Sequence, residues 1–215
     1  MNIQAALDKL NSQLPLKERQ DKLPQELKDL HRAVLHSLIN QGRPSTSDEL
    51  ADQFGKETVE SGLARLGADD LIVLDADGMN PVGAYPITSE QTPHKIIVKG
   101  HAIHAMCALD AVSVAPMFDT NVVIESECRV TKTPITIRMH GSKILEAIPT
   151  PGIIIGIRWQ MPSGAAAHSM CMEMVFLKDS KTAKDWQGGD VDNSSLFSLP
   201  DAVEFGKAFF LPLLE

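Results

Sequence analysis

The sequence predicts an α+β fold, in which an N-terminal winged-helix-like module of three helices precedes a mixed or antiparallel β-rich core with a few helices. Apolar residues recur at helical spacing in the first third of the chain, and short β-branched runs bounded by Gly, Pro or Ser follow. With 215 residues, the chain is also large enough to bury a core without disulfides. We expect residues 1–88 to form the module and residues 89–215 to form the core.

The module begins with charged sequence that has helical periodicity. Residues 1–30 predict one or two short helices, because Pro15 and Pro24 interrupt the pattern. Apolar side chains then recur every three or four positions in residues 25–39, which predicts a longer helix. A break at residues 42–44, Gly-Arg-Pro, ends it.

Two further helices and a hairpin complete the module. Residues 45–54 predict a helix with an N-cap and acidic residues in its first turn, and residues 56–66 predict a third helix. Strand-like residues 71–74 and 82–87 flank an Asp77-Gly78 turn. This order is typical of a winged helix-turn-helix, which often binds DNA.

The charge of the module argues against DNA as a partner. Its third helix carries Glu57 and Glu60 and lacks the basic stripe that phosphate contacts require. The whole chain has 20 basic and 28 acidic residues, a net charge of −8, which repels a phosphate backbone. We therefore interpret the module as a scaffold and expect no nucleic acid to bind.

The cysteine count and the N-terminal sequence bear on the compartment. Three cysteines cannot form a closed disulfide framework, and free thiols are typical of a reducing cytosol. The first residues lack the basic and apolar regions of a signal peptide, and no apolar stretch is long enough to span a membrane. We expect a cytoplasmic protein, monomeric or homodimeric, with no membrane contact.

The expected core consists mainly of strands. A strand at residues 95–98 leads through Gly100 into a helix within residues 101–118, and an amphipathic helix at residues 200–211 closes the chain. Met170, Met172 and Met174 alternate around Cys171, which indicates a strand that packs in the core, although a thioether-rich wall would also suit a soft-metal pocket. The other expected strands are residues 120–125, 129–130, 134–139, 152–159 and 172–177.

Cys107 and Asp110 are the first candidates for chemistry. In a helix, residues three positions apart share one face, so a thiol and a carboxyl would lie together in an apolar segment. An unpaired buried carboxylate is costly and becomes protonated or finds a partner. One interpretation is an ordinary core cysteine beside an aspartate that caps a loop, and the other is a chemical site.

The wider sequence favours the chemical site. In their order along the chain, four segments resemble the organomercurial (alkylmercury) lyase family, and the similarity extends over about residues 30–211, including residues 182–186. The segments are Gly83-Ala84-Tyr85-Pro86-Ile87-Thr88, the CALDAV block at residues 107–112, Ser126-Glu127-Cys128, and the run from Ser169 to Phe176 that contains Cys171.

The resemblance implies a role for each of these residues. It implies that Cys107 and Cys171 bind mercury, that Asp110 transfers the proton and contacts the mercuric product, and that Cys128 is mainly structural. It also implies small organomercurials as substrates. From the chemistry of these residues we expect no cofactor, and, because two thiolates hold mercuric ion tightly, we expect small thiols or a mercuric reductase to remove the product. Met106 departs from the family, which often has a large aromatic residue before the first catalytic cysteine, so the preferred alkyl or aryl group stays open.

The same residues suit this chemistry on physical grounds. Thiolates bind soft metals best, and cleavage of a carbon–mercury bond also needs a proton donor beside the leaving carbon. Burial and a neighbouring thiolate should raise the pKa of Asp110, so that it holds a proton near neutrality. No zinc-ligand spacing, hydrolase motif, Walker loop or dinucleotide fingerprint occurs. The alternative is a non-catalytic protein that binds or senses a soft metal, mercury or copper, with its winged-helix module.

Overall fold

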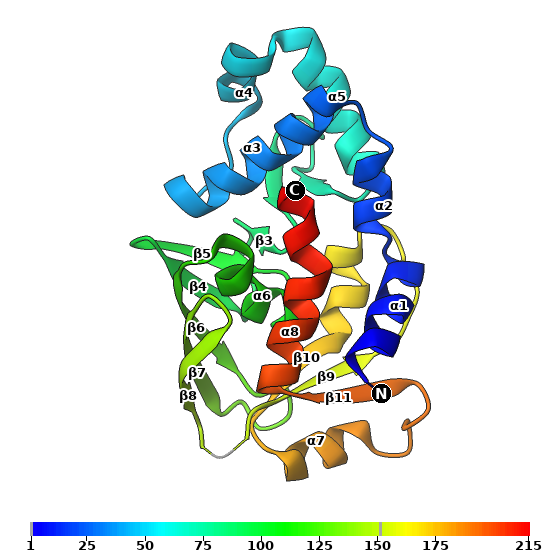
Figure 1. Cartoon of the computed structure of the whole chain (residues 1–215), viewed down its shortest axis with the longest axis vertical. Coiled ribbons are helices and arrows are strands. Elements are labelled where there is room, and N and C mark those ends of the chain that lie inside the picture. Colours follow the sequence, from blue (N-terminus) through cyan, green and yellow to red (C-terminus); the bar gives the residue numbers. More distant parts are fainter. Residues whose placement is uncertain (1, 151) are drawn as a thin grey trace.

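The computed structural model describes residues 2–150 and 152–215, so Met1, where the first predicted helical segment begins, lies outside the described residues. The α+β prediction is confirmed (Figure 1). The α-helices are α1 (Ile3–Gln13), α2 (Leu16–Asp21), α3 (Gln25–Gln41), α4 (Ser47–Phe54), α5 (Lys56–Ala68), α6 (Ala108–Phe118), α7 (Ser180–Gln187) and α8 (Leu199–Phe210). The 3-10 helices are η1 (Ala166–His168), η2 (Met170–Glu173) and η3 (Leu211–Leu214).

The strands form two antiparallel sheets. The larger has the order β1-β2-β3-β5-β4-β6-β7-β8, and the smaller has the order β10-β9-β11. The strands are β1 (Ile72–Leu74), β2 (Pro81–Ala84), β3 (Ile87–Thr88), β4 (Lys95–Val98), β5 (His101–Ala105), β6 (Asn121–Glu127), β7 (Pro134–His140), β8 (Lys143–Ile148), β9 (Ile154–Arg158), β10 (Met174–Leu177) and β11 (Ser194–Ser198).

The three predicted helices of the N-terminal module are present as α3, α4 and α5, and β1 and β2 form the hairpin after them. Helix α4 begins with a capping box, in which Thr46 and Glu49 satisfy each other's backbone N–H groups. The winged-helix assignment and the division at residue 88 remain predictions. The larger sheet continues across that division, because β3 pairs with β5.

Buried polar contacts also join the module to the end of the chain. The side-chain amide of Gln20 donates to the carbonyl of Leu213 at 2.7 Å and lies 3.0 Å from Nδ1 of His31. Gln20 and His31 are both fully buried. Buried hydrogen bonds of Gln20 therefore connect α2 with α3 and with η3.

Helix α6 lies at the centre of the fold, between the larger sheet and α8 (Figure 1). Residues 108–117 are all buried, as expected for a helix that is apolar on every side. Helix α8 approaches closely at Gly206, where an added Cβ would lie 1.9 Å from Oγ of Ser113. Only glycine fits at this crossing, so Gly206 determines how near α8 lies to α6.

The structure corrects several predicted elements. Residues 101–105 form strand β5, and Gly100 belongs to the turn between β4 and β5, so the helix starts only at Ala108. Residues 129–130 form a turn and not a strand. Residues 170–173 form η2, and Met172 is 51% exposed, so the methionine alternation does not mark a core strand there. Strands β8 and β11 and helix α7 were not predicted. No helix in the described ranges has the length and apolar composition that a membrane span needs.

Candidate active site

Cys107 and Asp110 lie at the start of α6. Cys107 is the N-cap of the helix, in extended conformation, and its Sγ accepts a hydrogen bond of 3.3 Å from the backbone N–H of Asp110. The sequence predicted that the two residues share one face of a helix. In the structure, Cys107 instead caps the helix, and this cap brings its thiol next to Asp110. The cap orients the Cys107 thiol toward the first turn, where the Asp110 carboxyl also lies.

Cys171 reaches the same place from η2, 64 positions later in the sequence. Sγ of Cys107, Sγ of Cys171 and a carboxylate oxygen of Asp110 all lie within 4.8 Å of one another. Their exposed fractions are 0%, 3% and 2%, respectively. We call these three residues the Cys–Asp–Cys cluster. It combines two soft donors with one proton-carrying group in a site that excludes bulk water.

Burial dominates the electrostatics of Asp110. It raises the pKa of the Asp110 carboxyl to about 7, although the neighbouring thiols of Cys107 and Cys171 act in the opposite direction. Oδ2 of Asp110 is buried and has no hydrogen-bond partner among the described residues. A buried carboxyl with an unpaired oxygen costs less free energy as the neutral acid than as the carboxylate. Asp110 can therefore accept or donate a proton near neutral pH.

The two thiols differ in their surroundings. Burial raises the pKa of Cys107 well above its usual value, and the hydrogen bond to Cys171 and the charge of Asp110 add to this effect. For Cys171, the hydrogen bond from Cys107 lowers the pKa, but burial and the carboxylates of Asp110 and Asp70 outweigh it and leave the pKa raised. Both thiols are therefore protonated at rest, and each must lose its proton before it binds a metal.

A pocket of about 300 Å³ opens beside the cluster. Cys171 lines it, together with Met106, Met174 and His94, whereas Cys107 and Asp110 do not. Sδ of Met174 lies 3.7 Å from Sγ of Cys107, so the thioether is in contact with the inner thiol. A ligand that enters the pocket thus meets Cys171 first, and Cys107 and Asp110 lie behind it.

Met106 is accommodated by a glycine of strand β2. An added Cβ at Gly83 would lie 2.9 Å from Cε of Met106 and 2.9 Å from the carbonyl oxygen of Ile87. Gly83 therefore leaves room for the long, flexible side chain of Met106. The pocket wall at this point is shaped by Met106.

Cys128 is separate from the cluster. It is fully buried in the turn after β6, where its backbone N–H donates to the carbonyl of Thr133 and its carbonyl accepts from the N–H of Lys132. Burial acts to raise its pKa, but hydrogen bonds from Thr131 and nearby backbone groups lower it below the usual value. All three cysteines are free thiols.

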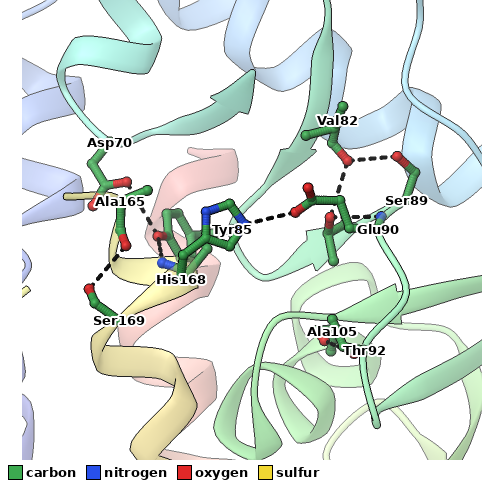
Figure 2. Close-up of polar contacts among 12 residues, drawn as sticks. Asp70, Val82, Tyr85, Ser89, Glu90, Thr92, Ala105, Ala165, His168 and Ser169 are labelled. Carbon is green, nitrogen blue, oxygen red and sulfur yellow. Dashed lines mark hydrogen bonds and ion pairs between the residues drawn. The ribbon is translucent and has the colours of Figure 1, made fainter. Parts of the chain in front are cut away.

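Three further residues near the site were given no role from the sequence. Tyr85 hydrogen-bonds to Asp70 and to the backbone just before Cys171 (Figure 2), and Asp70 also accepts from the N–H of Ala166. His94 lines the pocket with its Nδ1 2.9 Å from Oγ of Ser126. Burial lowers the pKa of His94 to about 4, so it is neutral at physiological pH. The only available signal was Tyr85, the single tyrosine of the chain, next to Pro86 in the motif shared with the family.

Comparisons with known proteins give one consistent family. The family model described as alkylmercury lyase matches residues 87–211, which is more than half of the chain. The alkylmercury lyase of Bacillus cereus is 28% identical over 189 residues, covering 85% of this chain and 81% of the relative. That of Staphylococcus epidermidis is 25% identical over 180 residues, covering 83% and 80%. A crystal structure of the mercury-bound form of MerB2 has a TM-score of 0.75 at 25% identity and covers 91% of this chain and 98% of that one.

Proposed function

The chain belongs to the alkylmercury lyase family, and we propose on this premise that it cleaves the carbon–mercury bond of small organomercurials by protonolysis, with Cys107, Cys171 and Asp110 as the catalytic residues. The products are a hydrocarbon and mercuric ion. The observation that carries the proposal is the Cys–Asp–Cys cluster itself, in which two thiols and a carboxyl of raised pKa lie within 4.8 Å of one another at the end of a pocket.

The first step is capture of the substrate by a thiolate. We propose that Cys171, which lines the pocket, transfers its proton and binds mercury, and that the ligand X of the substrate R–Hg–X leaves as HX. Mercury is a soft metal and prefers thiolate sulfur to oxygen or nitrogen ligands. Cys107 then binds from the other side after its proton has passed to the Asp110 carboxylate.

The second step breaks the bond. Asp110 delivers the proton to the carbon, which takes the electron pair of the carbon–mercury bond and leaves as R–H. In total, R–Hg–X and two thiols give R–H, HX and mercury held by two thiolates, and mercury stays in its +2 state throughout. Asp110 acts first as base and then as acid, which its pKa of about 7 permits at neutral pH.

The same residues account for the expected partners. Two thiolates and a carboxyl supply both the mercury ligands and the proton, so the reaction needs no cofactor. Because two thiolates retain mercuric ion strongly, we propose that small thiols or a mercuric reductase remove the product. The acidic chain has no proposed nucleic-acid partner, and the helical module of residues 1–88 is proposed as a scaffold for residues 89–215.

A turnover assay tests the proposal. Purified protein is incubated with methylmercury or phenylmercury and excess small thiol, and methane or benzene is measured in the headspace. We expect hydrocarbon from both, with one mercuric ion formed for each molecule released. Folded protein that binds mercuric ion but releases no hydrocarbon from either substrate would instead be the non-catalytic soft-metal protein considered from the sequence.

A further inference from the structure

Cys171 belongs to a part of the chain with little regular structure. We call residues 160–173 the Cys171 segment; it contains only the short helices η1 and η2 between β9 and β10. Strand pairing ends at Arg158, which pairs with β11, and begins again at Met174, which pairs with Ile157 of β9. The segment therefore needs other contacts to place the Cys171 thiol within a few ångströms of Cys107 and Asp110.

Two side chains of the N-terminal module, Asp70 and Tyr85, supply such contacts, and Figure 2 shows how they lie beside the segment. Oδ2 of Asp70 accepts a hydrogen bond of 3.1 Å from the N–H of Ala166. The hydroxyl oxygen of Tyr85 accepts one of 2.6 Å from the N–H of Ala167, and the hydroxyl donates to Oδ1 of Asp70 at 3.3 Å. Together they bind the first two N–H groups of η1.

These contacts answer a need that the segment does not meet itself. The N-cap of η1 is Ala165, which has no side-chain acceptor, and Ala166 and Ala167 are buried. Without these partners, the N–H groups of Ala166 and Ala167 would make no hydrogen bond, which is unfavourable where water is excluded. Tyr85 is fully buried, and burial raises the pKa of its hydroxyl, so the group stays protonated and can donate to Asp70.

The contacts pass along the segment to Cys171. Oγ of Ser169 donates to the carbonyl of Ala165 at 3.0 Å, and the carbonyl of Ser169 accepts from the N–H of Met172 at 3.1 Å. Ser169 thus joins the start of η1 to η2, and Cys171 is the second residue of η2. The hydrogen bond between Glu90 and His168 also touches the segment, but the two side chains are 46% and 59% exposed, so water competes with it.

We infer that Asp70 and Tyr85 are positioning residues for Cys171: they hold η1 from the N-terminal module and thereby keep the Cys171 thiol beside Cys107 and Asp110. Neither touches the reacting atoms. The inference rests on the proposed function for its effect on turnover, whereas its effect on the thiol itself does not depend on the reaction.

The test compares Tyr85→Phe with a matched control. Tyr85→Phe keeps the ring and removes the hydroxyl, which leaves the N–H of Ala167 unpaired. Ser37→Ala removes a buried hydroxyl that likewise accepts a backbone N–H, from Ser45 at 2.9 Å, in the same module but away from the pocket. For each variant, the rate at which a small neutral alkylating reagent modifies Cys171 is measured by peptide mass spectrometry, and kcat and KM are measured with phenylmercury.

We expect Cys171 in Tyr85→Phe to be modified about fivefold faster or more than in the wild type, because the segment opens more often without its bond. The kcat should fall roughly tenfold with little change in KM, since misplacement of the thiol affects the reaction more than capture. Ser37→Ala should stay within about twofold on both measures. If Tyr85→Phe does not fold, Asp70→Asn replaces it, because its amide offers one acceptor oxygen in place of two. We then expect smaller changes in the same direction, with faster modification of Cys171 and a lower kcat.

Two results would overturn the inference: modification of Cys171 in Tyr85→Phe no faster than in the wild type, whether or not kcat falls, or equally fast modification in Ser37→Ala. The first would mean that Tyr85 does not act through Cys171, and the second that any lost hydroxyl loosens the whole protein. If the wild type releases no hydrocarbon but Tyr85→Phe exposes Cys171, the positioning role stands and the proposed reaction fails.

Discussion

Cys107 and Asp110 come from the N-cap and the first turn of α6, a helix buried on every side. Cys171 comes from a segment of turns that is held by side chains of another part of the chain. On the α6 side, backbone hydrogen bonds and close packing place the thiol and the carboxyl. On the Cys171 side, a few hydrogen bonds to Asp70 and Tyr85 do so.

The difference separates two requirements of the proposed reaction. Proton transfer needs a fixed distance between donor and acceptor, and the inner thiol and the carboxyl lie on one rigid element. Capture of substrate and later release of product need access, and the outer thiol lies on the less regular element that borders the pocket. Substitutions on the two sides should therefore have different consequences.

The largest effects are expected from the thiols. Cys107→Ser and Cys171→Ser each replace a soft ligand by a hydroxyl, which is a poor ligand for mercury and a poor nucleophile at neutral pH. Both should lose turnover, but Cys107→Ser should still capture the organomercurial through Cys171. Mass spectrometry of variants incubated with phenylmercury and passed over a desalting column tests this. An adduct on Cys171→Ser but not on Cys107→Ser would reverse the order of the two thiols.

The next effect concerns the carboxyl on the rigid side. In Asp110→Asn both thiols remain, but the amide can neither take a thiol proton nor give one to carbon. Hydrocarbon release should fall by roughly a hundredfold or more, the usual contribution of general acid–base catalysis, while mercuric ion still binds. Gas chromatography of the headspace and a mercury-binding titration measure the two properties. Wild-type turnover in this variant would make Asp110 a structural residue only.

The same variant should change how stability depends on pH. Burial raises the pKa of Asp110 in the folded state to about 7, above the unfolded value near 3.8, so the folded protein retains a proton that the unfolded chain loses. Its contribution is most favourable below about pH 4 and falls by about 1.4 kcal/mol for each pH unit up to about pH 7. In urea unfolding between pH 4 and pH 8, the difference in unfolding free energy between wild type and Asp110→Asn should fall with this slope, because the other titrating groups are common to both proteins. If unfolding free energy changes with pH in the same way in both proteins, the Asp110 carboxyl is not held as the neutral acid in the folded state.

The smallest effect is expected where α8 supports the rigid side. Gly206→Ala places a methyl group 1.9 Å from Oγ of Ser113, so α8 must move away from α6, at a cost of about 1–3 kcal/mol in unfolding free energy. Gly189→Ala is the matched control, because no atom lies within 4 Å of a Cβ added there. Chemical denaturation compares them. Equal stability of the two variants would show that the crossing of α6 and α8 tolerates the added methyl.

Periodicity in the sequence was sufficient for the N-terminal helices. Their apolar spacing, proline breaks and the cap at Thr46 are local signals, and α3, α4 and α5 begin and end within a few residues of the predicted bounds. Local signals failed for residues 101–105, because a short run of small and apolar residues before a helix is compatible with either structure. Its pairing with β4 and β3, which no local pattern reveals, makes it a strand.

The sequence by itself determined the chemical identity of the candidate site: two thiols and a carboxyl, in an order shared with one family. The tertiary structure decided which thiol borders the pocket, that Asp110 is buried deeply enough for a pKa of about 7, and that Asp70 and Tyr85 bind the segment before Cys171. The physical reason is that residue types and short-range periodicity are properties of neighbouring positions. Desolvation and contacts between residues 64 or 96 positions apart arise only when the whole chain has packed.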